Sequence, residues 1–125
     1  MATFVNLTTY KKKFLIVRIT NTYKPCYSEF QIYECSRGYW ALDPEHAKEM
    51  DYIISVYKGE IKGVYEAVAW FPANSTFNSI LPVSPAPEGR YEFVGREAKD
   101  PAIKSLVGKI IQGCNSKGNP VTYCK

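Results

Sequence analysis

The chain has 125 residues, a formal net charge of +4, and 46% hydrophobic against 22% charged residues. This composition is typical of one soluble domain, residues 1–125, that is long enough to bury its own core. Apolar runs are only a handful of residues long, which excludes a membrane-spanning helix because such a helix needs ~20. The mild positive charge permits attraction to nucleic acid or acidic surfaces without requiring it. Aromatic residues make up 14%, and the ten tyrosines among them favour a β-rich fold, a ligand-binding surface, or both.

The N-terminal part combines three lysines at 11–13 with the run FLIVRIT at 14–20. The lysines are typical of a solvent-exposed segment that precedes a strand. The run itself predicts a strand with apolar residues on both faces, as in the centre of a sheet. Only Phe14–Val17 are apolar before Arg18, which is too short for the h-region of a signal peptide. We therefore expect a cytoplasmic protein with reduced cysteine thiols.

The cysteines lack the spacing of a metal site. No CxxC pair is present, and the single histidine, His46, is distant from them in sequence. Small buried cysteines, with an exposed one near the C-terminus, are the simpler interpretation. We expect no metal and no cofactor. The four cysteines are Cys26, Cys35, Cys114 and Cys124.

Three segments carry helix start signals. Ser28 and Gln31 have the spacing of a capping box, which predicts a helix of about ten residues that stops at Gly38. Asp43-Pro44 and Asp100-Pro101 each place an N-cap residue before a proline at the first helical position. These two signals predict short helices over Pro44–Met50 and Pro101–Val107.

Residues 51–70 predict one long β-hairpin around Lys58-Gly59, because Gly59 can take the positive φ of a tight turn. A shift of the pairing by one residue would turn the polar side chains of the hairpin into the core, so the register is strongly specified. The expected pairs are Tyr57 with Glu60, Val56 with Ile61, Ile54 with Gly63, and Tyr52 with Tyr65. The apolar face would then hold Tyr52, Ile54, Val56, Ile61 and Tyr65, with Ile53 and Val64 as exceptions on the polar face.

The rest of the chain adds a loop and two strands. Residues 71–89 contain four prolines and several serines and asparagines, which predicts a long surface loop. Arg90–Arg96 and Val121–Cys124 have the pattern of strands, the latter at a sheet edge. Together these elements predict an α+β fold with a curved, mostly antiparallel sheet or pseudo-barrel and two or three short helices.

Six short stretches, in a fixed order along the chain, carry a family resemblance. They are Tyr33–Trp40, Ser55–Tyr65, Trp70, Arg90–Gly95, Val107–Lys109 and Asn119–Tyr123. In this order they resemble a family of small bacterial domains associated with nuclease or restriction-type proteins. The likeness covers about residues 28–123, and it implies such neighbours without assigning catalytic residues.

The order of elements is itself similar to a second group. Strand, helix, small helix, long hairpin, strand, helix and strand resemble the PUA, ASCH and EVE pseudo-barrels. This likeness rests on architecture and not on motif residues. It implies RNA or modified DNA bases as ligands.

Catalytic chemistry is weakly indicated. A nucleophilic triad needs a base beside the nucleophile, and His46 lies in a short helix rich in charge, where a solvated position is typical. Glu60, Lys62 and Glu66 share a face of the hairpin and could serve a metal-dependent nuclease. Alternating charges on a solvated strand are also normal cross-strand pairing. We expect a non-enzyme, with the nuclease as an alternative.

Aromatic and basic residues meet at the ends of predicted elements, which favours nucleic-acid binding. Aromatic rings stack on bases, basic groups contact phosphates, and a flipped base needs a pocket with both. Trp40 and Trp70 also adjoin apolar residues, so burial in the core is the competing interpretation. The expected ligand-binding residues are Arg37, Tyr39, Trp40, Lys58, Trp70 and Arg90.

The favoured function is a non-catalytic nucleic-acid-binding module that reads RNA, DNA, or a modified or flipped base. Arg37, Lys58 and Arg90 would contact phosphate or the base edge. The alternative to binding nucleic acid is a protein-interaction module that engages a partner through the 71–89 loop.

Overall fold

A computed structural model describes residues 3–82, 88–114 and 119–124. Its described residues form eight strands, three short α-helices and one 3₁₀ helix, which confirms the predicted α+β class. The strands are β1 (Phe4–Asn6), β2 (Phe14–Arg18), β3 (Trp40–Ala41), β4 (Tyr52–Tyr57), β5 (Glu60–Pro72), β6 (Arg90–Glu97), β7 (Ile110–Gln112) and β8 (Val121–Cys124). The helices are η1 (Leu7–Thr9), α1 (Glu29–Ser36), α2 (Pro44–Ala47) and α3 (Pro101–Lys104).

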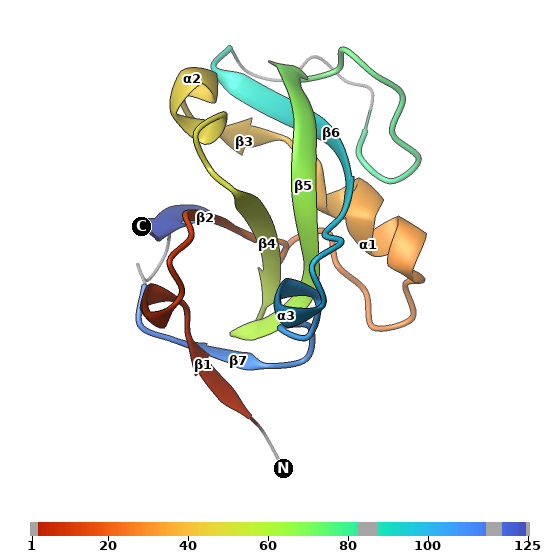
Figure 1. Ribbon diagram of the computed structural model, residues 1–125. Helices are drawn as coiled ribbons and strands as arrows, with labels where there is room; N and C mark the ends of the chain where they lie inside the picture. Colours follow the sequence, from red (N-terminus) through yellow and green to blue (C-terminus); the bar gives the residue numbers. More distant parts are fainter. Residues whose placement is uncertain (1–2, 83–87, 115–118, 125) are drawn as a thin grey trace.

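The strands form one mixed sheet, with the order β1-β7-β5-β4-β2-β8 and with β6 and β3 attached beside β5. Most pairs are antiparallel, but β2–β4 and β1–β7 are parallel. Figure 1 shows the long strand β5 with β6 beside its upper part, α1 beside its middle and β7 near its lower end. The pairs of the described residues follow an open path and do not close into a barrel.

The sheet separates two hydrophobic cores, and β2 contributes to both. Phe14 and Ile16 belong to the first core, whereas Leu15 and Val17 belong to the second. All four side chains are fully buried, which confirms the prediction of a central strand. The first core also includes Leu7, Ile54, Val56, Ile61, Val64 and Leu106, and the second includes Trp40, Ile53, Tyr65, Trp70 and Phe93.

The hairpin forms around Lys58-Gly59 as predicted, with positive φ at both turn residues, 50° and 83°. Its predicted register holds only near the turn, where Tyr57 pairs with Glu60 and Val56 with Ile61. The other two predicted pairs are wrong, because a β-bulge at Lys62 places one extra residue in β5. The observed pairs beyond the bulge are Ser55 with Gly63, Ile54 with Val64, and Ile53 with Tyr65.

The bulge reverses the faces of the β5 residues that follow it, Val64 and Tyr65 among them. Because side chains alternate along a strand, one extra residue turns every later residue to the opposite face. Val64 therefore joins Ile54 in the first core, while Tyr65 joins Ile53 in the second. Ile53 and Val64, the two exceptions to the predicted pattern, are both buried, because Val64 faces the first core and the face that holds Ile53 is covered by the second.

All three predicted helix starts are confirmed. Ser28 and Gln31 form the capping box of α1, and Asp43 and Asp100 cap α2 and α3 ahead of a proline. The helices are shorter than predicted, at eight, four and four residues. After α2 the chain continues in tighter turns, because the N–H groups of Glu49 and Met50 donate to the carbonyl oxygens of His46 and Ala47, three residues back. None of the helices in the described ranges has the length and apolar character to cross a membrane.

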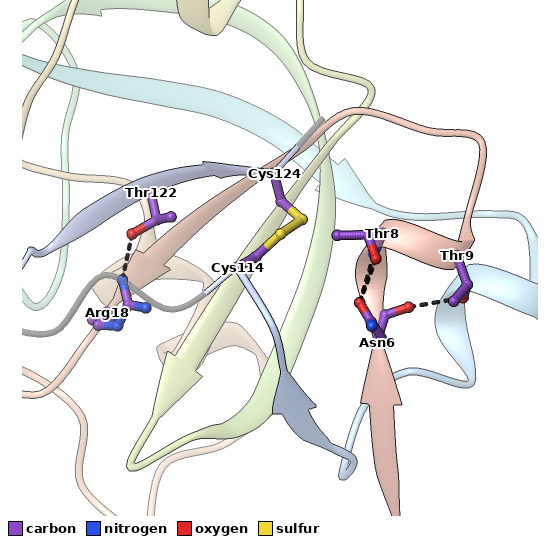
Figure 2. Close-up of a disulfide and its surroundings, with 7 residues drawn as sticks. All are labelled: Asn6, Thr8, Thr9, Arg18, Cys114, Thr122 and Cys124. Carbon is purple, nitrogen blue, oxygen red and sulfur yellow. Dashed lines mark hydrogen bonds between the residues drawn. A yellow bond between two sulfur atoms is a disulfide. The ribbon is translucent and has the colours of Figure 1, made fainter.

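Two of the four cysteines form a disulfide, so the expectation of four reduced thiols is wrong for this pair. Cys114 follows β7, Cys124 ends β8, and their Cα atoms are 5.6 Å apart (Figure 2). The two sulfurs meet because the sheet brings these chain segments together, which no spacing rule reveals. Cys26 and Cys35 are free thiols. The cytoplasmic location stays a prediction.

We predict that Gly95→Ala destabilises the fold by about 1–3 kcal/mol, because a Cβ here overpacks the sheet. The added carbon would lie 2.2 Å from the carbonyl oxygen of Glu66. Gly95 pairs with Ala67 of β5, next to a shift in the β5–β6 register. Urea denaturation measures the change in the free energy of unfolding. Val68→Ala is the matched control, since this β5 side chain is 69% exposed. Equal stability of both variants would contradict the steric account.

Candidate functional site

Arg37 lies at the centre of a buried ionic network. Its guanidinium donates to the carboxylates of Glu34 at 2.7 Å and Glu92 at 3.3 Å. It also donates to the carbonyl oxygens of Phe93 and Phe77 and to the hydroxyl of Thr76. The three charged residues are only 2–4% exposed. The network therefore joins the end of α1, the middle of β6 and the loop after β5.

The two carboxylates of this network organise that loop. Glu34 accepts hydrogen bonds from the backbone N–H and the hydroxyl of Ser79. Glu92 accepts them from the backbone N–H groups of Ser75 and Thr76. Asn78 adds a bond from its side-chain amide to the carbonyl oxygen of Glu34. Residues 75–79 of the predicted 71–89 loop thus pack on the network, while Phe71 and Pro72 belong to β5 and residues 83–87 lie outside the described residues.

The predicted contact between Arg37 and phosphate finds no support in this arrangement. Its five hydrogen bonds match the five N–H groups of a guanidinium. A ligand could reach Arg37 only by displacing acceptors inside the protein. Arg37 is therefore a positioning residue, and the segment it positions includes Tyr39 and Trp40.

A cavity of about 500 Å³ lies where the segment after α1 faces the ends of β2 and β8. Three of the six predicted ligand-binding residues line it, namely Tyr39, Trp40 and Arg90. Among the described residues of its lining there are two arginines and neither Asp nor Glu. We call it the basic cavity; its other polar lining residues include Arg18, Asn21, Thr22 and Asn119.

Hydrogen bonds fix the aromatic side of the basic cavity. The hydroxyl of Tyr39 donates to the carbonyl oxygen of Pro82 at 3.2 Å, and burial with the charge of Glu92 raises the pKa of this phenol. Trp40 is 7% exposed, and its indole N–H donates to the carbonyl oxygen of Ser36. Trp40 is therefore mainly a core residue that presents one edge to the cavity.

The two arginines are held less completely than Arg37. Exposed Arg90 donates from Nη1 to the carbonyl oxygen of Tyr39 at 3.2 Å. Arg18 donates from Nη1 to the carbonyl oxygen of Asn119 and to the hydroxyl of Thr122. Partial burial lowers the pKa of Arg18 by desolvation. Sequence reasoning missed Arg18 as a site residue, although a charge inside the apolar run FLIVRIT was the available signal.

Lys58 and Trp70 do not line the basic cavity. The ammonium of Lys58 lies at the hairpin turn, 5.4 Å from the centre of the Tyr57 ring. Trp70 is 8% exposed and packs on Phe93 in the second core, with ring centroids 5.3 Å apart. For Trp70 the competing interpretation, burial in the core, is the observed one.

A second cavity, of about 540 Å³, lies between α1 and β5. Its lining contains both acidic and basic residues, and the one lysine described in this lining, Lys62, already forms an ion pair. The ammonium of Lys62 lies 2.8 Å from the carboxylate of Glu60 and 5.2 Å from the Tyr23 ring centre. Internal pairing of this kind is typical of a satisfied surface, so the basic cavity is the stronger candidate site.

The carboxylates of the hairpin do not form a metal site. Glu66 accepts a bond from the backbone N–H of Lys99, which with the nearby Arg96 lowers the pKa of Glu66. Glu60 pairs with Lys62 instead. Within the described ranges no three His, Cys, Asp or Glu side chains lie close enough together to hold a metal ion. The described carboxylates of the hairpin therefore give no support to the metal-dependent nuclease, which stays an untested alternative.

Comparison with protein-family models, with curated proteins and with solved structures found no match to the chain. Both resemblances stated from the sequence stay predictions. The function is accordingly inferred from the chain's own residues.

We predict that Arg37→Met lowers the free energy of unfolding by about 3–5 kcal/mol, because it leaves two carboxylates buried without their cation. Arg96→Met is the matched control. Arg96 forms an ion pair with Glu66 that is partly exposed, and exposed ion pairs contribute about 0.2–1 kcal/mol to stability. Urea denaturation compares the two variants. Similar losses in both would show that the Arg37 network does not hold the loop and helix together.

Proposed function

We propose that the protein is a non-catalytic nucleic-acid-binding module whose basic cavity accepts an unpaired or flipped base together with an adjacent phosphate. One observation carries this proposal. Two arginines and two aromatic residues line a single cavity whose described lining contains no carboxylate. Such a cavity attracts an anion that also has a flat apolar ring, and a nucleotide has both.

The size and chemistry of the cavity support this ligand. A volume of about 500 Å³ lies within the range of known small-ligand sites. Tyr39 supplies a ring on which a base can stack, and such stacking contributes ~1–3 kcal/mol. Arginine matches phosphate oxygens with paired N–H donors. The bonds that Arg18 makes within the described residues use only Nη1, so Nε and Nη2 can serve a ligand.

Polar groups in the lining suit recognition of a base edge. Asn21 and Asn119 carry amides, and Thr22 carries a hydroxyl. These groups both donate and accept hydrogen bonds, as the edges of bases do. Modified bases and RNA, which the likeness to PUA, ASCH and EVE pseudo-barrels implies, are the first ligands to test.

We predict that Arg90→Gln and Tyr39→Ala weaken binding of a fluorescently labelled single-stranded oligonucleotide, measured by anisotropy as RNA and as DNA. Tyr39→Ala loses a stacking surface, so affinity falls about fivefold to hundredfold. Arg90→Gln loses one phosphate contact, so the slope of log affinity against log salt becomes shallower by about 0.7.

Arg96→Gln is the control for charge, since Arg96 is also exposed but lies outside the basic cavity. It should retain the parent's affinity. Parent-like binding by Arg90→Gln and Tyr39→Ala, or an equal loss in Arg96→Gln, would overturn the site assignment. Binding by none of the proteins, the parent included, would overturn the function.

A protein-interaction role is the second candidate, and Phe77 is the observation that favours it. Its ring is 81% exposed, yet its carbonyl oxygen accepts a bond from buried Arg37. The fold thus holds an apolar ring in solvent at a fixed place in the 71–89 loop. Ordered aromatic residues of this kind are frequent anchors in protein interfaces.

We predict that Phe77→Ser abolishes co-purification of a partner while leaving stability within about 0.5 kcal/mol, because the ring has no core contacts to lose. Affinity purification of tagged parent and variant from the same cells provides the comparison. Phe30→Ser is the control, since Phe30 is 62% exposed on α1, outside the loop. An unchanged set of partners for Phe77→Ser would contradict this role.

A further inference from the structure

The disulfide encloses the part of the chain that forms one wall of the basic cavity. Cys114 and Cys124 are ten residues apart. Asn119, Pro120 and Val121 all lie between them, and all three line the cavity. Figure 2 shows the disulfide beside β8, with Arg18 bonded to Thr122 on the same strand.

Arg18 depends on this enclosed segment for its position. Its Nη1 donates to the carbonyl oxygen of Asn119 at 2.9 Å and to the hydroxyl of Thr122 at 2.8 Å. Its backbone N–H donates to the carbonyl oxygen of Pro120 at 2.9 Å. Every described hydrogen bond that aims the Arg18 side chain at the cavity therefore comes from residues between the cysteines.

In the described part of this segment, residues 119–123, the other restraints are strand pairing and the packing of Val121 and Tyr123 on the second core. β8 has four residues and, within the described residues, pairs only with β2. Tyr123 also stacks on His46 of α2, with ring centroids 3.9 Å apart. Short edge strands are the part of a sheet that opens most easily, and a cross-link at the end of the strand opposes this opening.

We propose that the redox state of Cys114–Cys124 controls the order of Asn119–Thr122 and, through it, the placement of Arg18 in the basic cavity. The expected effect of this redox state on ligand affinity rests on the proposed function. The bond is broken by a dithiol reductant. One thiolate of the reductant attacks a sulfur of the disulfide, and its second thiolate resolves the mixed disulfide. Two electrons and two protons pass to Cys114 and Cys124, and the reductant leaves as its own disulfide.

Cys114 is half-buried, whereas Cys124 is 1% exposed. The sulfur of Cys114 is therefore the accessible end for a reductant. Reduction removes only the cross-link, so the β2–β8 pairs and the stacking on His46 still form, but they open more often. The expected effect is a loosened cavity wall in a protein that stays folded.

The test compares the oxidised parent, the parent reduced with dithiothreitol, and Cys114→Ser. Mass spectrometry after alkylation first establishes the disulfide in the oxidised parent, and its absence there overturns the proposal. Hydrogen exchange without ligand then follows the amides of residues 121–123. We expect exchange at least about tenfold faster in the reduced parent and in Cys114→Ser, because local opening becomes easier. Equal protection in all three overturns the proposal.

Cys26→Ser is the matched control, since Cys26 is an exposed free thiol. It should behave as the parent in both redox states. Binding of the labelled oligonucleotide is measured on the same samples, and affinity should fall about tenfold on reduction, as the wall loses order. If no sample binds the oligonucleotide, the proposed function fails, while the exchange result still decides whether the disulfide orders this wall.

Discussion

The region around the basic cavity depends on the burial of one cation, the guanidinium of Arg37. A buried charge is costly unless every donor and acceptor is matched. Arg37 meets two carboxylates, Glu34 and Glu92, so one negative charge remains in the network. Backbone N–H groups of the loop after β5 compensate this charge by donating to both carboxylates. The helix end, β6 and the loop therefore fix one another's positions.

This constraint determines where the cavity lies. The chain leaves Arg37, passes Gly38, and enters β3, which pairs with β6. Tyr39 and Trp40 are thereby held on one side of the basic cavity, with the Tyr39 hydroxyl bonded to the carbonyl oxygen of Pro82 at the end of the described loop segment. The opposite side comes from β2 and from the residues that lead into β8. The cavity thus lies between the segment held by the ionic network and β8, the strand that ends at the disulfide cysteine Cys124.

Local signals in the sequence predicted local structure well. The caps at Ser28, Asp43 and Asp100 and the turn at Lys58-Gly59 act within a few residues, so the sequence contains their physical cause. Features set by distant contacts were not predictable in the same way. The bulge in β5, the parallel pairing of β2 with β4 and the disulfide each depend on segments that meet only in the folded protein. Of the predicted site residues, only Tyr39, Trp40 and Arg90 converge on one cavity.

The arginines show why residue type alone could not identify the site. A guanidinium serves a ligand only if its N–H groups are not already used inside the protein. Arg37 donates hydrogen bonds from all five of its N–H groups. Within the described residues, Arg18 and Arg90 each donate from Nη1 alone. Because no described Asp or Glu lines the basic cavity, the positive potential of these two groups has no internal counter-charge there. Neither arginine pairs with a carboxylate within the described residues, and this is the physical reason that the proposed ligand is an anion.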